Sequence, residues 1–237
     1  MPPRRQPLQR LPAAPRPTHF LALPLHNHST LRTRVANFQR SLFDGEGKPL
    51  VRGLDRTIII DPRRLHLTLG VMALERVEDA LALLQSLQPQ LRALLAEQHT
   101  AVKVKLEKLD VLKTERRTGA DGVEEIDAHV LYLGVPERVA DDEETLRLKR
   151  VCDVVHQAFK KAGHITETRP LKLHCTILNT SHRRPRRREA FSYSDILKTV
   201  TAASSFGTYD VERVELWEMG SRGPNNEYIS CGGINLG

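Results

Sequence analysis

The sequence predicts an α+β protein built from two similar halves that close around a shared cleft. Helical and strand-like apolar patterns alternate along the chain. Each half also contains a helix that leads into an apolar strand with the pattern His, any residue, Thr. Such a repeated order is typical of a duplicated unit, so we expect the matching strands to meet at the cleft.

The first half is expected to contain strands, a short helix and a long helix. Residues 18–25 (THFLALPL) and 65–74 (LHLTLGVMAL) are continuous apolar segments, and residues 57–60 (TIII) are β-branched, so all three are predicted as strands. Apolar residues three to four apart predict a helix over 30–43 that ends before the glycines of the next loop. A leucine-rich helix is expected over 77–98, with Pro89 kinking or splitting it.

The second half is expected to begin with a hairpin. Residues 101–113 alternate apolar and charged side chains, and residues 126–135 form a second strand after the turn-prone TGADG. An amphipathic helix over 142–162 should end at Gly163, and the next strand is expected at 171–180 (LKLHCTILNT). A short helix over 192–202 and two final strands, over 208–219 and 227–236, complete this half.

The composition is close to that of ordinary globular proteins. The chain has 237 residues, of which 40% are hydrophobic and 27% charged, so it can bury a core without disulfides. Residues 1–17 mix Pro and Arg without an apolar period, which predicts a disordered Pro/Arg-rich tail. We therefore expect the folded domain, with its two lobes, to occupy residues 18–237.

Several classes of protein are disfavoured. Three cysteines without CxxC spacing and the absence of an apolar leader argue against a secreted disulfide scaffold, so a nuclear or cytoplasmic location is expected. No run reaches the roughly 18 apolar residues needed to cross a bilayer, so no membrane association is expected. The net charge of +7 favours a polyanionic partner such as nucleic acid. Alternatively, part of this charge lies in flexible segments and marks no site.

The pattern His-x-Thr occurs four times, and strand geometry separates the four. In a strand, residues i and i+2 share one face while their neighbours share the other. Only the strands around His66 and Thr68 and around His174 and Thr176 place apolar residues at every position of the opposite face. In these two strands the core is expected to hold one face while both polar side chains point into the cleft.

These residue types suit phosphodiester chemistry. Cleavage of a phosphodiester needs a base for the attacking oxygen and an acid for the leaving oxygen, and histidine serves as either near neutral pH. A threonine beside each histidine can donate its hydroxyl proton to a phosphoryl oxygen. We therefore predict His66 and His174 as catalytic and Thr68 and Thr176 as phosphate-binding. The alternative is that each histidine only satisfies a buried hydrogen bond.

These segments also resemble a known family. LHLTLGVMAL and LKLHCTILNT resemble the paired motifs of the two-histidine, or LigT-like, phosphoesterases. THFLALPL, KLHCTILNT and EYISCGGINL are similar to the phosphoesterase domains of the activating signal cointegrator 1 complex subunit 1 type and the A-kinase anchoring protein 7 type. The resemblance extends over residues 18–237, with the motifs in the same order.

The resemblance implies a bilobal fold with a pseudo-twofold axis, in which two antiparallel sheets with flanking helices surround a central cleft. Members of the superfamily act on 2′,3′-cyclic phosphates or RNA 3′ ends without a metal, so no metal and no other cofactor is expected. Some relatives of the anchoring-protein type are better known for binding nucleoside monophosphates.

The remaining candidates are contacts to nucleic acid. Five arginines follow the second His-x-Thr strand and are candidates for holding a phosphate backbone: Arg183, Arg184, Arg186, Arg187 and Arg188. A nuclear-import signal or a solvated loop explains the same run. Lys172 shares the face of His174 and is a candidate phosphate contact, although a solvated lysine is the alternative.

Two further patterns involve aromatic and imidazole side chains outside the His-x-Thr strands. Tyr228, placed in the last predicted strand, is a candidate for base stacking or phosphate binding, with core packing as the alternative. His26 and His28 have chelating spacing, but no Asp, Glu or Cys stands beside them, which disfavours a metal site.

Two functions are therefore expected, and both have RNA or a nucleotide as partner. The first is a metal-independent phosphodiesterase that acts on RNA ends or 2′,3′-cyclic phosphates by acid–base catalysis with two histidines. The second is a catalytically weak nucleotide- or RNA-binding adaptor module within a transcription-coactivator or repair complex.

Overall fold

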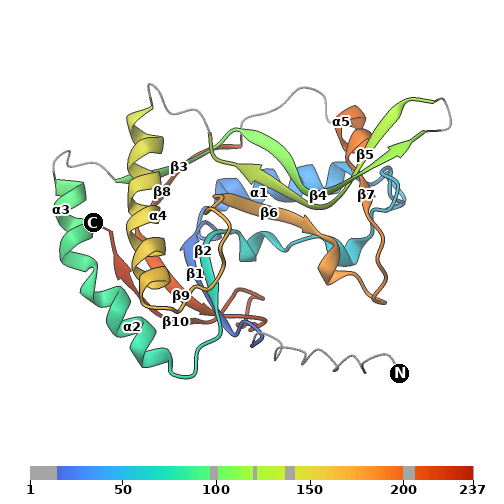
Figure 1. The fold of residues 1–237 in the computed structure, drawn as a ribbon. Coiled ribbons are helices and arrows are strands. Elements are labelled where there is room, and N and C mark those ends of the chain that lie inside the picture. The colour runs from blue at the N-terminus through green and yellow to red at the C-terminus, as the bar shows by residue number, and fades with distance from the viewer. Residues whose placement is uncertain (1–14, 97–100, 120–121, 137–141, 200–205, 237) are drawn as a thin grey trace, which may run out of the picture.

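The computed structural model describes residues 15–96, 101–119, 122–136, 142–199 and 206–236. Of the predicted tail, residues 1–14 and their expected disorder lie outside the described residues, and 15–17 are exposed and irregular. Helices and antiparallel sheets build two lobes that share one apolar core, which confirms the predicted fold class (Figure 1).

The first lobe is built on a four-stranded antiparallel sheet in the order β10-β9-β1-β2. Its strands come from both ends of the chain: β1 (His19–Pro24), β2 (His66–Met72), β9 (Arg213–Glu218) and β10 (Ser230–Asn235). The second lobe is built on β4 (Lys108–Thr118), β5 (Glu124–Gly134) and β6 (His174–Asn179), in that order, and the short β7 (Phe191–Ser192) also pairs with β5. In Figure 1 the β4–β5 hairpin extends away from α2, α3 and α4.

A small third sheet was not predicted. It pairs β3 (Val102–Leu106) with β8 (Gly207–Val211). The segments 101–113 and 208–219 were each predicted as one strand, but the chain leaves one sheet and enters another at Glu107 and at Glu212. Both predictions of a single strand were therefore wrong.

The helices largely follow the predicted patterns. Helix α1 (Ser29–Ser41) buries Leu31 and Val35, and the leucine-rich segment is split at Leu87 into α2 (Val77–Ser86) and α3 (Gln88–Ala96), as Pro89 predicted. The described part of the last helix is α5 (Tyr193–Thr199).

Helix α4 (Glu143–Lys161) has clear start and stop signals. The Asp142 side chain accepts a hydrogen bond from the Thr145 amide at the N-terminus, and acidic residues occupy the first turn and basic residues the last. Gly163 then takes a left-handed φ of 81°, which ends the helix.

The segment TIII is not a strand, contrary to the prediction. Thr57 and Ile58 lie in a 3-10 turn, Arg56–Ile58, because the Asp55 side chain accepts hydrogen bonds from the Thr57 amide and hydroxyl. Ile59 forms only an isolated bridge to Leu178 of β6. Two further 3-10 turns, Pro62–Arg64 and Thr180–His182, lie immediately before β2 and immediately after β6.

No helix among the described residues is long and apolar enough to span a bilayer. The three cysteines, Cys152, Cys175 and Cys231, are free thiols.

Candidate active site

The two predicted His-x-Thr segments are the edge strands of the two large sheets. β2 ends the sheet of the first lobe, β6 lies at the edge of the β4-β5-β6 path, and the two strands contact each other. The other two matches are not on strands, since His28 precedes α1 and His164 follows α4. Strand geometry therefore selected the two matches that lie on strands.

Both strands carry an irregularity at the same place. In the β1–β2 pair, Thr68 lies opposite Ala22 and Gly70 opposite Leu21, so Leu69 is an extra residue. In the β5–β6 pair, Thr176 lies opposite Tyr132 and Leu178 opposite Leu131, so Ile177 is an extra residue. A bulge of this kind bends a strand and re-aims its side chains. Each bulge directly follows the threonine.

Each bulge carbonyl is held by a buried polar side chain from a helix. His156 of α4 donates from Nδ1 to the Leu69 carbonyl at 2.7 Å, and Gln39 of α1 donates from Nε2 to the Ile177 carbonyl at 3.0 Å. Gln39 also donates to the Ile60 carbonyl at 2.8 Å. These two donors are 4% and 5% exposed, so the two lobes fix equivalent points with equivalent contacts.

The two histidines have the same ring orientation. His66 Nδ1 lies 2.7 Å from the Arg64 carbonyl, and His174 Nδ1 lies 2.7 Å from the Lys172 carbonyl. A carbonyl oxygen only accepts, so Nδ1 carries the proton in both rings. Nε2 is then the nitrogen that exchanges protons, and in His66 it lies 3.1 Å from the Thr68 hydroxyl.

The surroundings favour the neutral form of both rings. Burial lowers the pKa of His66 to about 4, the carbonyl of Arg64 opposes this effect, and the nearby His174 adds to the lowering. Burial also lowers the pKa of His174. The His66 ring packs against Phe20 and Tyr228, with centroid distances of 5.0 and 5.4 Å.

A cavity of about 740 Å³ opens beside these strands and is lined by His66, Thr68 and Thr176. His174 is not part of its lining; it lies two residues from Thr176 on the same strand face, with its ring edge-on to Tyr132 at 5.3 Å. The cationic side chains of the cavity are Arg64, Arg184 and Arg222, together with the titratable His182. This lining suits a bound anion.

The arginine run is divided by the fold, so its five members do not act as one contact. Arg184 lines the histidine cavity, whereas Arg186, Arg187 and Arg188 line a second cavity. Arg183 is 1% exposed, and its guanidinium donates to the Gly53 and Glu189 carbonyls and pairs with Asp55. Arg183 also borders the second cavity, but these contacts hold its side chain inside the fold, and its contact with nucleic acid stays a prediction.

Two other candidates lie elsewhere than predicted. Tyr228 precedes β10 rather than lying in it, and its ring packs under the Arg64 guanidinium at 3.6 Å and stacks on Trp217. Its hydroxyl has no hydrogen-bond partner among the described residues, so the hydroxyl is the part left for a ligand. Lys172 extends over Tyr132 and lines a different cavity from His66.

Sequence reasoning missed Arg64, Gln39 and His156. Arg64 donates to the carbonyls of Ser221 and Asn226, and so ties the segment before β2 to the loop before β10. The available signal was a polar residue on the otherwise apolar face of a helix, as at Gln39 and His156.

In the described ranges no group of three or more His, Cys, Asp or Glu side chains is arranged to hold a metal ion, and this includes His26 and His28.

Two lobes whose matching His-x-Thr edge strands contact each other define a LigT-like two-histidine phosphoesterase fold, as the resemblance predicted. The chain belongs to the family described as "AKAP7 2′5′ RNA ligase-like domain", whose model matches residues 17–236.

Sequence and structure comparisons agree with this assignment. The chain is 25% identical over 238 aligned positions to activating signal cointegrator 1 complex subunit 1 of Mus musculus, covering 92% of this chain and 63% of that protein. It thus spans less than two thirds of this relative's length.

Among solved structures, E. coli LigT complexed with 3′-AMP matches with a TM-score of 0.52 and 14% identity, over 93% of this chain and 98% of that chain. The Thermus thermophilus protein TT0787 matches with a TM-score of 0.54 and 19% identity, over 92% of this chain and 97% of that chain. These similarities establish the fold.

Proposed function

We propose that the protein is a phosphodiesterase that cleaves 2′,3′-cyclic phosphates or phosphodiesters at RNA ends with His66 and His174 as base and acid, without a metal. The observation that carries this proposal is the matched orientation of the two rings. Each Nδ1–H donates to the carbonyl two residues earlier, which leaves Nε2 to exchange protons, and Nε2 of His66 lies 3.1 Å from the Thr68 hydroxyl.

In the proposed reaction one Nε2 takes a proton from the attacking water as its oxygen bonds to phosphorus. The bond from phosphorus to a ribose oxygen then breaks, and the other imidazole, in its protonated form, gives that oxygen a proton. The product is a ribose hydroxyl beside a phosphomonoester. The histidine that acts as base in one direction of the reaction acts as acid in the reverse direction. The similar environments of the two rings suit either role.

The cavity lining supplies stabilisation for the phosphate. Thr68 and Thr176 donate their hydroxyl protons to the non-bridging oxygens, and Arg64, Arg184 and Arg222 provide positive charge around them. The bound anion also favours protonation of an imidazole, which offsets the lowered pKa of both rings and produces the acid.

RNA is proposed as the substrate class on three grounds. The chain has a net charge of +7, its family is described as 2′5′ RNA ligase-like, and the related E. coli LigT was crystallised with 3′-AMP.

The test is turnover of 2′,3′-cyclic AMP and of an oligoribonucleotide with a 2′,3′-cyclic phosphate end, with and without excess EDTA. We expect a phosphomonoester product in both conditions and a bell-shaped dependence of kcat/KM on pH. His66→Ala and His174→Ala should each lower turnover by about 1000-fold, whereas His164→Ala, in a His-x-Thr match outside the strands, should leave it unchanged. Loss of activity in EDTA would disprove the metal-independent mechanism.

A second candidate is a nucleotide- or RNA-binding module that uses the same cavity without turnover. The lowered pKa of both histidines favours it, since burial disfavours the imidazolium that would act as the acid. Tight binding of 3′-AMP with no product from either substrate would select this function.

A further inference from the structure

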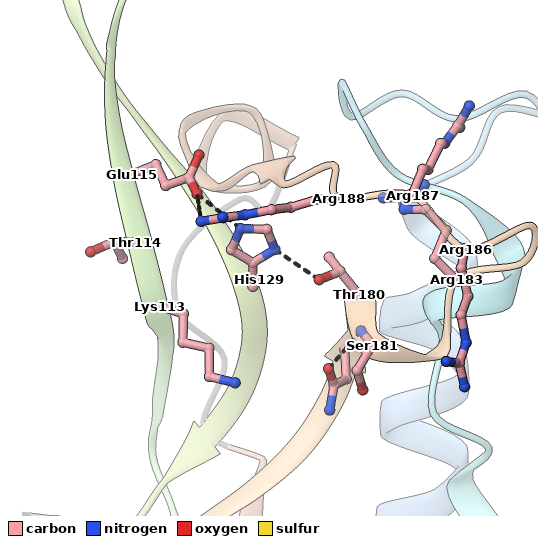
Figure 2. A pocket seen from close by; sticks show the side chains of 11 residues that line it. Lys113, Thr114, Glu115, His129, Thr180, Ser181, Arg183, Arg186, Arg187 and Arg188 are labelled. Carbon is pink, nitrogen blue, oxygen red and sulfur yellow. Dashed lines mark hydrogen bonds and ion pairs between the residues drawn. The ribbon is translucent and has the colours of Figure 1, made fainter. Parts of the chain in front are cut away.

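A second cavity, of about 960 Å³, lies next to the histidine cavity. Asn179, the last residue of β6, lines both. The second cavity is bounded by β4 and β5 and by the segment that follows β6 (Figure 2). The two cavities therefore adjoin at Asn179.

The exposed cations of this cavity outnumber its carboxylates. Lys113, Arg186, Arg187 and Arg188 line it, and Glu115 is the one acidic residue of the lining. Arg188 pairs with Glu115 at 3.4 Å in a solvent-exposed pair that a competing anion can displace, whereas Arg187 pairs at 2.7 Å with a buried carboxylate oxygen of Glu189. Among the described residues no carboxylate lies within ion-pair distance of Lys113 or Arg186.

Lys113 also has an unusual backbone. Its φ is +57°, in the left-handed region that residues other than glycine rarely adopt, and it interrupts the pairing between Leu112–Val130 and Thr114–Ala128 of β4 and β5. Such a conformation is energetically unfavourable and is concentrated at ligand sites. The strain turns the Lys113 side chain toward the cavity (Figure 2).

Polar groups beside the cations are already ordered. His129 of β5 lies between two partners, with Nε2 at 3.2 Å from the Glu115 carboxylate and Nδ1 at 2.8 Å from the Thr180 hydroxyl, as Figure 2 shows. The carboxylate only accepts, so the neutral ring carries its proton on Nε2 and accepts the Thr180 proton at Nδ1.

We propose that this second cavity binds a backbone phosphate of an RNA strand whose terminal phosphate occupies the histidine cavity. The inference rests on the proposed function and narrows it, because it makes oligoribonucleotides, rather than mononucleotides, the preferred ligands. A polyanion with regularly spaced charges fits two basic cavities that share a wall, and excess positive charge in the second attracts it through counterion release.

The test compares affinities of 3′-AMP and of a labelled octaribonucleotide with a 3′-phosphate end, neither of which requires turnover. The variant Lys113→Gln/Arg186→Gln removes the two cations that have no carboxylate partner, so it leaves no carboxylate newly unpaired. The control Arg92→Gln/Arg150→Gln removes the same charge from exposed positions on α3 and α4, which line neither cavity.

We expect the octamer to bind wild-type protein more tightly than 3′-AMP, and the cavity variant to lose at least about tenfold in octamer affinity at moderate salt. In a plot of log affinity against log salt concentration, the slope of the cavity variant should be less negative by about 0.7 for each phosphate that the variant no longer binds. The affinity for 3′-AMP should stay within about twofold of the wild-type value in both variants, since neither variant changes the histidine cavity.

An octamer affinity equal in the cavity variant and the control would overturn the proposal, as would equal wild-type affinities for 3′-AMP and the octamer. Recognition of an acidic protein segment instead of RNA would give this result. Failure of the proposed catalysis is distinguishable, because it removes turnover but leaves these binding differences in place.

Discussion

Gln39 offers a direct test of how the fold positions Thr176 in the histidine cavity. This side chain is 5% exposed, and its single amide group donates to the Ile60 and Ile177 carbonyls at 2.8 and 3.0 Å. Gln39→Leu keeps the size of the side chain and removes both hydrogen bonds. Ile177 still accepts from the Ile60 amide at 3.0 Å, so the bulge that follows Thr176 is loosened rather than dissolved.

The expected magnitude follows from these contacts. Two hydrogen bonds at roughly 1 kcal/mol each predict a loss of about 2 kcal/mol of unfolding free energy, or about 6 °C in Tm for a chain of this size. If the bulge positions Thr176, kcat/KM for a 2′,3′-cyclic phosphate should fall by about tenfold or more at 20 °C, well below the melting transition.

The assay combines thermal unfolding with kcat/KM on the same preparations. Gln157→Leu is the matched control, because Gln157 is exposed on α4 beside His156, and both quantities should stay near the wild-type values. A variant of Gln39 with lowered Tm but unchanged kcat/KM would refute the positioning role, and an unchanged Tm would refute the stabilising one.

Three further predictions concern the titration, the threonines and the buried arginine. The fold lowers the pKa of His66 from 6.5 to about 4, so between these pH values the unfolded chain binds a proton that the folded protein does not. The free energy of unfolding should therefore rise by up to about 3 kcal/mol from pH 4 to 6.5, as urea titrations can measure. His66→Asn should flatten this pH dependence, and an unchanged pH dependence in that variant would contradict the prediction. Thr68→Val and Thr176→Val should each lower kcat about 100-fold in steady-state assays with little change in Tm, whereas full activity would remove their role. Arg183→Met should cost about 3 kcal/mol of stability in the same titrations, and a neutral result would contradict its structural role.

The site was predictable where strand periodicity and chemistry agreed. The apolar neighbours of His66, Thr68 and Thr176 are buried on one face while these residues remain accessible on the other, as alternation requires. Periodicity also predicted α1 and α4, and Pro89 correctly predicted the break between α2 and α3.

The two points where the chain passes from one sheet to another, Glu107 and Glu212, have a signal in the sequence. Apolar positions alternate up to Leu106 and resume at Leu109, and they alternate up to Val211 and resume at Val214, so a spacing of three interrupts a period of two. Such a shift moves the apolar positions to the other face of a regular strand, and here the chain accommodates it by changing sheets.

The long-range contacts of the arginine run had no local signal. Arg183 is buried because Gly53 and Asp55, distant in sequence, supply its acceptors, whereas its neighbour Arg184 remains exposed. The division of the run between a buried ion pair and two cavities depends on tertiary packing alone, as do the bulges at Leu69 and Ile177.

A double-mutant cycle on His66 and His174 tests the central claim most directly. Single-turnover cleavage of an oligoribonucleotide with a 2′,3′-cyclic phosphate end should be measured for wild-type protein, His66→Ala, His174→Ala and the double variant. Acid and base acting on one phosphate predict a loss of about 1000-fold in each single variant and little further loss in the double variant. Losses that multiply, or a single variant with near wild-type rate, would contradict the claim that the two imidazoles work as a pair.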